Sequence, residues 1–237
     1  MPNHVRNIIK MEGIEKLSII KVNDEGEKFF DFNALIPMPE SLNMESGTIE
    51  EIAIEAAIRN LAKRRYNFQR PYAMPAMTDK KYWERVSNCR KSQDELIELG
   101  LQYITNKIKY GATTWYDWNV ENWGTKWNSY DNEIEKNCVK FSTAWSDPTP
   151  IIRKLSEKYP DVKVEHWWAD EGMGNNTGHR ILIAGKEIQN VSAEYVNESQ
   201  DAYECYVFCW GESKCLHKDE SGNWVRNECE ECDGCDQ

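Results

Sequence analysis

Three polar side chains around a glycine-rich turn have the types that acid, base or metal chemistry requires. Asp170 and Glu171 precede residues 172–178, and His179 follows them. If strands flank the turn, these side chains and Asn175 converge at one end of a sheet. Turns between strands also attract Asp, Asn and Gly for backbone reasons alone. The set matches no spacing of a catalytic motif, so we take the four residues as candidate ligand- or partner-binding residues and assign no catalytic role.

Residues 116–128 mix large aromatic rings with hydrogen-bonding groups. Exposed indole rings are surfaces on which a nucleobase stacks, while amide and ammonium groups bind its edge or a phosphate. Packing is the alternative, because Trp123 and Trp127 are four residues apart and would share one face of a helix. The candidate binding residues in this segment are Trp118, Asn122, Trp123, Lys126 and Trp127.

Six of the eight cysteines lie in the last 33 residues. Cysteines spaced by two residues, with a Cys-x-His pair upstream, supply enough soft ligands for a tetrahedral zinc site. The spacing is not that of a zinc ribbon or a bacterial ferredoxin cluster, and free thiols or disulfides are the alternatives. A chain of this length needs no cofactor to fold, so we expect none, and zinc is possible only in the C-terminal extension. Its predicted ligands are Cys215, His217, Cys229, Cys232 and Cys235.

The negative charge of the chain is concentrated at its C-terminal end. Residues 186–237 contain 13 Asp and Glu against 4 Lys and Arg, and the net charge of the whole chain is −11. Such a block repels phosphate backbones and membrane surfaces, and it suits solubility or a basic partner. Direct binding of nucleic acid is therefore disfavoured.

The N-terminal residues lack the apolar block of a signal peptide, and no apolar run approaches the length of a membrane span. We therefore expect a soluble cytoplasmic protein.

Hydrophobic periodicity predicts strands and helices in alternation. The order is strand, helix, strand, a mostly helical insertion, then strand, helix and a two-stranded hairpin. This order is typical of an α+β ferredoxin-like sandwich, with a mixed or antiparallel sheet and helices on one face. We expect a domain over residues 1–185 with the insertion at about 48–110, followed by an acidic, Cys-rich extension at 186–237. The predicted strands are 5–11, 29–36, 138–145, 162–169 and 179–184, and the predicted helices flanking the insertion are 14–20 and 147–160.

Short motifs spread over residues 1–185 carry a family resemblance. They are Met1–Val5, Ile36–Leu42, Tyr116–Trp118, Asn122–Asn128, Thr143–Trp145, Leu155-Ser156, Tyr159-Pro160 and Asp170-Glu171 with Gly174. In this order the motifs resemble the YubB-like proteins of phages and plasmids. The resemblance implies a ferredoxin-like domain without an iron–sulfur cluster, and a mobile-element origin with action inside a bacterium. It supplies no catalytic residue.

Three classes of function follow from these features. The family resemblance and the acidic C-terminal end favour a non-catalytic binding protein that acts on a host macromolecule, as a counter-defence inhibitor does. The alternative is a protein that binds a nucleotide or a nucleotide-derived signal through the tryptophan-rich segment. An enzyme ranks last, because no nucleophile and base motif, metal-hydrolase pattern or phosphate loop supports it.

Overall fold

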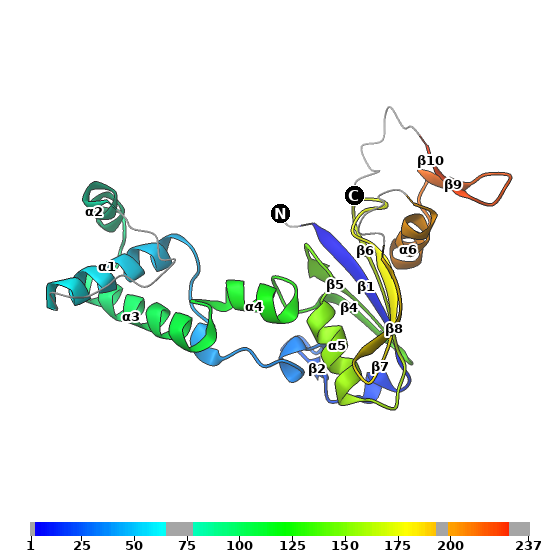
Figure 1. The fold of residues 1–237 in the computed structure, drawn as a ribbon, viewed down its shortest axis with the longest axis horizontal. Helices are drawn as coiled ribbons and strands as arrows, with labels where there is room; N and C mark the ends of the chain where they lie inside the picture. The colour runs from blue at the N-terminus through cyan, green and yellow to red at the C-terminus, as the bar shows by residue number, and fades with distance from the viewer. Residues whose placement is uncertain (1–2, 65–77, 193–198, 228–237) are drawn as a thin grey trace. The chain divides into compact units, whose positions relative to one another are not determined.

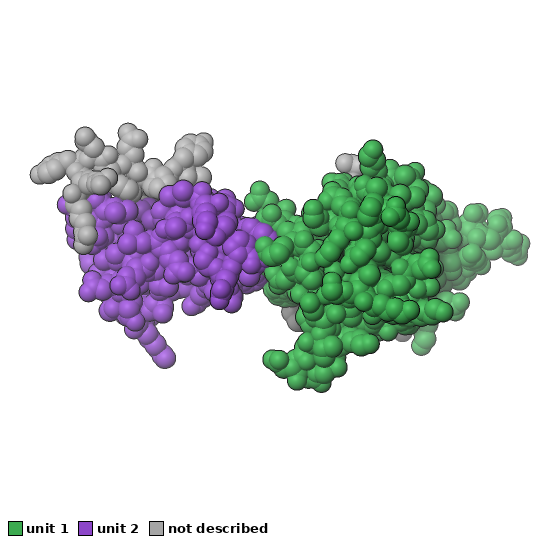
Figure 2. Space-filling model, turned by 90° about the horizontal axis from the view of Figure 1, so that it is seen from below, with its two compact units in different colours: residues 1–37, 119–237 green, residues 38–118 purple. Residues whose placement is uncertain are grey.

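The computed structural model describes residues 3–64, 78–192 and 199–227, and the chain divides into two compact units (Figure 2). Unit 1 consists of Met1–Pro37 and Asn119–Gln237, and unit 2 of Met38–Trp118. The helices expected between residues 48 and 110 lie in unit 2. Within the described residues, no helix combines the length and the apolar character that crossing a bilayer requires.

Unit 1 is built on a six-stranded antiparallel sheet (Figure 1). The central strand β1 pairs with β5 on one side and with β6 on the other. The chain passes from β5 through helix α5 to β6, so the two strands that flank β1 are joined by a split β-α-β connection. The predicted α+β class is confirmed. In sheet order the strands are β4 (Tyr130–Glu135), β5 (Cys138–Ala144), β1 (His4–Lys10), β6 (Val164–Asp170), β7 (Gly178–Ile183) and β8 (Lys186–Ser192).

Two helices cover opposite faces of this sheet. Trp167 and Trp168 are successive residues of β6, so their side chains point to opposite faces. The ring of Trp167 lies 4.4 Å from that of Phe208 in α6 (Gln200–Trp210). Trp168 instead lies under the guanidinium of Arg180, which donates to Thr149 at the start of α5 (Thr149–Lys158). The sequence predicts helices on only one face of the sheet. The structure differs from this prediction because α6 covers the other face.

The face under α5 contains the main hydrophobic core of unit 1. Ile151, Ile152 and Leu155 follow helical spacing in α5 and are fully buried. They lie on one side of the helix, as an amphipathic helix on a sheet requires. Strand residues that alternate along the sheet complete this layer, namely Val5, Ile9, Val139, Phe141, Val164 and Leu182.

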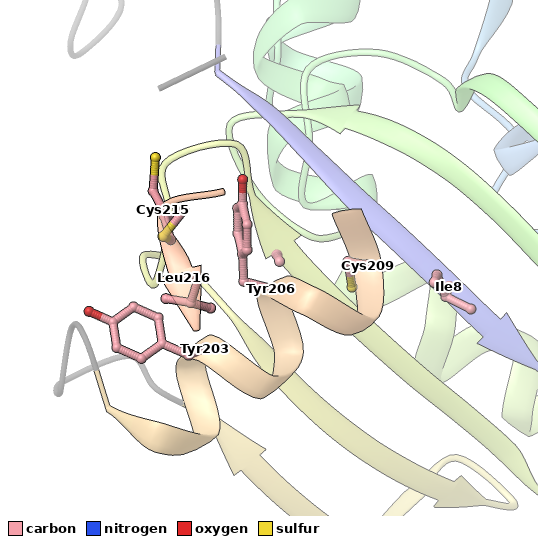
Figure 3. Close-up of a cluster of buried hydrophobic side chains, with 8 residues drawn as sticks. Ile8, Tyr203, Tyr206, Cys209, Cys215 and Leu216 are labelled. Atoms are coloured by element: carbon pink, nitrogen blue, oxygen red, sulfur yellow. The ribbon is translucent and has the colours of Figure 1, made fainter. Parts of the chain in front are cut away.

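The face under α6 carries a second cluster, drawn in Figure 3. Tyr203, Tyr206 and Cys209 of α6 pack with Ile8 of β1, and Leu216 of β9 joins them. Burial raises the pKa of Cys209 well above its ordinary value, so this thiol stays protonated. The cluster is completed by Ala169, Met173 and Cys215, and the adjoining hairpin consists of β9 (Leu216–Lys218) and β10 (Trp224–Arg226).

The predicted domain boundary at residue 185 falls inside a hairpin of the sheet. Ala184 and Gly185 form the turn between β7 and β8, with φ of 50° and 76°. Two left-handed residues are what a tight hairpin turn requires, so the chain continues directly into β8. Residues of the expected extension therefore supply the strand β8 and the helix α6. The buried face of α6 is mostly apolar, although residues 186–237 are acidic on average.

The first predicted helix differs from the structure. Residues 14–20 were expected to be helical, but only Ile14–Lys16 form one 3-10 turn. A short hairpin follows, in which Gly26 has a φ of 85° and Asn23 N donates to Glu27 O. Ile20, which the helical spacing assigns to the predicted helix, begins this hairpin instead. Its strands are β2 (Ile20–Val22) and β3 (Lys28–Phe30), and the 3-10 turns Phe32–Ala34 and Glu40–Leu42 follow.

Unit 2 is a helical unit in which α1 packs against α3. A Cβ on Gly100 of α3 would lie 1.9 Å from the carbonyl oxygen of Ala53 in α1, so only glycine permits this approach. Ser92 and Glu95 form a capping box that starts α3 and separates it from α2. The helices are α1 (Thr48–Arg64), α2 (Asp79–Ser87) and α3 (Gln93–Tyr110), and α4 (Trp115–Trp123) spans the boundary between the two units.

Candidate functional site

One end of the unit 1 sheet gathers exposed aromatic rings. His4 begins β1 opposite Ala144, the last residue of β5, and Glu171 follows β6. The backbone N–H of Glu171 donates to the carbonyl of His4 at 2.8 Å. Antiparallel pairing thus brings the start of one strand beside the ends of two others. We call this region the tryptophan end and define it as His4, Lys126, Trp127, Tyr130, Trp145 and Glu171.

The residues that follow α4 are attached to the end of β5. Gly124 has a φ of 80° and stops the helix after Trp123. The hydroxyl of Thr125 donates to the carbonyl of Ala144 at 2.8 Å and accepts from its N–H at 3.1 Å. This pair of hydrogen bonds fixes where the next two residues, Lys126 and Trp127, leave the sheet.

Lys126 lies between two exposed indole rings. Its Nζ is 4.6 Å from the ring centroid of Trp127 and 5.0 Å from that of Trp145. The two residues are 37% and 43% exposed. An ammonium at these distances from a ring face is held by the ring quadrupole. Lys126 therefore orients both rings while their outer surfaces stay in solvent.

The backbone of Trp145 is strained. Its φ is 72°, in the left-handed region that large side chains rarely adopt. Two hydrogen bonds hold it there, because its N–H donates to the carbonyl of Asn3 at 2.9 Å and its carbonyl accepts from Asn176 Nδ2 at 3.0 Å. Strain of this kind costs about 1–3 kcal/mol and is concentrated at functional sites in proteins.

A hydrogen-bond chain assigns the protons of His4. The hydroxyl of Tyr130 donates to the carbonyl of Thr143 at 3.0 Å, and its oxygen lies 2.8 Å from His4 Nδ1. Because the single hydroxyl proton is already committed, Nδ1 carries the proton and donates to Tyr130. Nε2 of neutral His4 is then a hydrogen-bond acceptor.

Two carboxylates add negative charge beside Tyr130 at this end. Burial raises the pKa of Tyr130 to about 12, and the charges of Asp131 and Glu171 add to the increase. A phenol whose ionisation is opposed by neighbouring carboxylates marks a place where positive charge is favoured.

Asp170 has a structural role, since its Oδ1 accepts from Asn3 Nδ2 at 3.2 Å and from Gly172 N at 2.8 Å.

The structure separates the predicted tryptophan-segment residues into two groups. Trp118 and Trp123 are buried, and the indole N–H of Trp123 donates to the carbonyl of Ile36 at 2.9 Å. Their ring faces are used in packing, as the T-shaped contact of Trp123 with Phe32 shows. Trp123 and Trp127 do not share a helical face, because α4 ends at Trp123. Asn122 is half-buried, and Lys126 and Trp127 belong to the tryptophan end.

His179 does not join Asp170 and Glu171. It pairs with Trp167 across β6 and β7, on the α6 face, where the two rings stack at 3.7 Å. Its Nε2 lies 3.4 Å from a carboxylate oxygen of Glu165. Burial lowers the pKa of His179, and Glu165 opposes this effect. Asn175 is exposed in the turn.

Three of the five predicted zinc ligands, Cys229, Cys232 and Cys235, lie outside the described residues. Cys215 is disulfide-bonded in the structure, and His217 is exposed on β9. In the part of the chain that the structure describes, no three His, Cys, Asp or Glu side chains group around a point where a metal ion would fit. The zinc site stays a prediction.

Sequence reasoning left His4, Tyr130 and Trp145 out of the candidate site. They lie far apart in sequence, and only the pairing of β1, β4 and β5 brings them together. The available signal was position, since His4 and Trp145 stand where two predicted strands begin and end.

Comparison with known proteins supports the fold of this region. Residues 122–208 match a family model described as the ferredoxin-like domain in Api92-like protein. The match runs from the end of α4 into α6, so it includes β8 and most of α6, which lie beyond the predicted domain boundary at residue 185.

Among solved structures, the crystal structure of a protein Api92 from Yersinia pseudotuberculosis is 10% identical, covering 81% of this chain and 98% of that chain. The TM-score of the two structures is 0.37. A search of curated proteins found no match.

Proposed function

We propose that this chain is a non-catalytic binding protein that engages another macromolecule through the tryptophan end. The observation that carries the proposal is Trp145, whose ring is 43% exposed while its backbone is held at a φ of 72°. An exposed ring contributes little to the stability of the core, so the ring does not offset the free-energy cost of the strained backbone. A partner that covers the ring would offset this cost. Tryptophan is also the residue most enriched among the energetically dominant positions of protein interfaces.

The resemblance to YubB-like proteins of phages and plasmids indicates where the protein acts and where its partner comes from. A mobile-element protein acts in the cytoplasm of its bacterial host, so the partner is a host macromolecule. Inhibition of a host defence protein is the activity that this setting favours.

Photo-crosslinking in bacterial cells tests the proposal. A photoreactive amino acid replaces Asn175, which is exposed in the turn beside Asn176, and crosslinked partners of the Trp127→Ala and Trp145→Ala variants are compared with those of the parent chain. Trp83→Ala is the matched control, because Trp83 is 57% exposed in unit 2. We expect one crosslinked partner whose yield falls at least about tenfold in both variants and stays unchanged in the control. Equal yields from all four chains would contradict the proposal.

A nucleotide-derived ligand is the second candidate, and the position of Lys126 supports it. The ammonium between two indole rings, with the acceptor Nε2 of His4 in the same region, would serve a stacked base that carries a phosphate. Thermal shift with a panel of nucleotides tests this idea. Stabilisation that disappears in Trp127→Ala would support it, and no response at millimolar nucleotide would exclude it.

A further inference from the structure

We infer that the tryptophan end is a receptor for a cationic side chain, with Lys126 as its resident occupant, which an arginine of a basic partner segment displaces. The inference rests on the proposed binding function and names the chemistry of the partner.

The ring faces already hold a cation. Lys126 Nζ lies within 5.0 Å of two indole centroids, and indole binds cations more strongly than the rings of Tyr or Phe do. Both residues are partly exposed, so their side chains can be reached from solvent. The geometry needed to bind a partner's side chain is thus present in the unbound protein.

The surrounding charge favours a positive partner over a negative one. The carboxylates of Asp131 and Glu171 act on Tyr130 in the same region. Unit 1 as a whole contains 17 Lys and Arg against 29 Asp and Glu. A phosphate that approaches Lys126 meets this negative field, whereas a basic segment is attracted by it.

Arginine fits the site better than lysine does. Its guanidinium is planar, stacks on aromatic faces and is less strongly hydrated than an ammonium. When arginine replaces Lys126 between the rings, the released ammonium regains its full hydration. Two indole rings that flank a single cation therefore select a side chain that can lie flat against them.

A peptide titration tests the inference on the full chain. The probe is a ten-residue peptide of alternating glycine and arginine, and the matched control replaces each arginine with citrulline, its neutral isostere. Indole N–H signals of ¹⁵N-labelled protein are followed by NMR, with the signals of Trp127 and Trp145 assigned from their alanine variants. We expect the arginine peptide to shift these two signals, and the citrulline peptide to leave them unchanged. Equal shifts with both peptides, or no shift at millimolar arginine peptide, would overturn the inference.

Single substitutions of Trp127 and Lys126 give the sign of the effect on binding of the arginine peptide. Trp127→Ala should weaken binding of the arginine peptide about two- to fivefold, as loss of an exposed cation–π contact predicts. Lys126→Gln should tighten it, because the resident cation no longer competes. Trp83→Ala in unit 2 should have no effect. Weaker binding by Lys126→Gln would show that Lys126 supports the site and is not displaced from it, and the inference would fall.

The two proposals fail in different ways. If crosslinking to the cellular partner depends on Trp127 and Trp145 but falls in Lys126→Gln, the binding function stands and the displacement of Lys126 by a partner's cation is excluded. If crosslinking is independent of both tryptophans, the binding function itself is excluded.

Discussion

The tryptophan end and the α6 face of the sheet use the same residue types for different purposes. On the α6 face, His179 stacks on Trp167, Glu165 accepts from the indole N–H at 2.9 Å, and Phe208 of α6 packs against the ring. At the tryptophan end, rings, a histidine and a carboxylate also lie together, but Trp127 and Trp145 remain partly exposed. Aromatic and polar residues therefore become packing where an element covers them, and a candidate site where none of the described elements does.

The largest expected effect concerns the covering element itself. A chain that ends at Gly185 lacks β8 and α6 and exposes Ile8, Ala169 and Met173 of the second cluster. Loss of this apolar contact should abolish cooperative unfolding and cause aggregation. Urea unfolding followed by circular dichroism, with size-exclusion chromatography, measures this.

The control for that truncation is a chain that ends at Asn227, which retains every described element. With reductant present, so that Cys215 is a thiol in both chains, it should unfold like the full chain. If the chain ending at Gly185 also folds normally, the α6 face is dispensable and the distinction between the two regions is wrong.

The second prediction compares two tryptophans of the same segment. Trp123→Ala should reduce the free energy of unfolding by about 3–5 kcal/mol, because the ring is 2% exposed and its loss leaves a cavity. Trp127→Ala should change it by less than about 0.5 kcal/mol, as is usual for an exposed position. Urea titrations of both variants provide the test, and a loss above about 2 kcal/mol for Trp127→Ala would place that ring in the core.

The third prediction uses pH. Because burial lowers the pKa of His179 below the ordinary 6.5, the unfolded chain binds a proton more readily than the folded chain. Stability should thus be lost as pH falls through 6.5, by at most about 1.4 kcal/mol per pH unit for this group. His179→Gln should lose less stability than the parent chain between pH 7.5 and 5.5.

Two other histidines define the comparison for that experiment. His166 is fully buried and also has a lowered pKa, so it stays unchanged in both chains and its contribution cancels. His217→Gln, on the exposed strand β9, serves as the control for loss of an imidazole elsewhere in the chain. A steeper loss in His179→Gln would contradict the assigned direction.

The smallest expected effect tests the strain at Trp145. Glycine normally destabilises relative to alanine, but it accepts a φ of 72° without steric cost. Trp145→Gly should therefore be more stable than Trp145→Ala by about 1 kcal/mol. Denaturant midpoints of the two variants decide this, and the ordinary order, with alanine more stable, would mean that the backbone relaxes after substitution.

Local patterns predicted much of the fold. Alternation in residues 138–145 and the glycine-rich turn before His179 located β5 and the β6–β7 hairpin, and apolar spacing after Pro148 located α5. Pairing in space was not predictable in this way. The acidic composition after residue 185 concealed the buried side of α6, because burial there depends on Tyr203, Tyr206 and Cys209 rather than on the average charge.

The candidate site was predicted only in part for the same physical reason. Density of tryptophan pointed to residues 116–128, yet Trp118 and Trp123 before Gly124 are buried and Trp127 after it is partly exposed. Trp145 joins Trp127 through Lys126, a contact that arises from strand pairing and has no local signal.

The insertion of unit 2 into unit 1 has a kinetic consequence. Val5 and Thr143 are hydrogen-bonded neighbours in the sheet although they are 138 positions apart in the chain. During synthesis β1 emerges first and must wait for β5, while the helices of unit 2 form from local contacts. Once these helices have folded, the chain ends that flank them are held closer than in an open loop, and the entropy lost on closing the sheet is smaller. We therefore expect a folded unit 2 to speed the pairing of β1 with β5, and this pairing can be completed only after Ala144 has been synthesised.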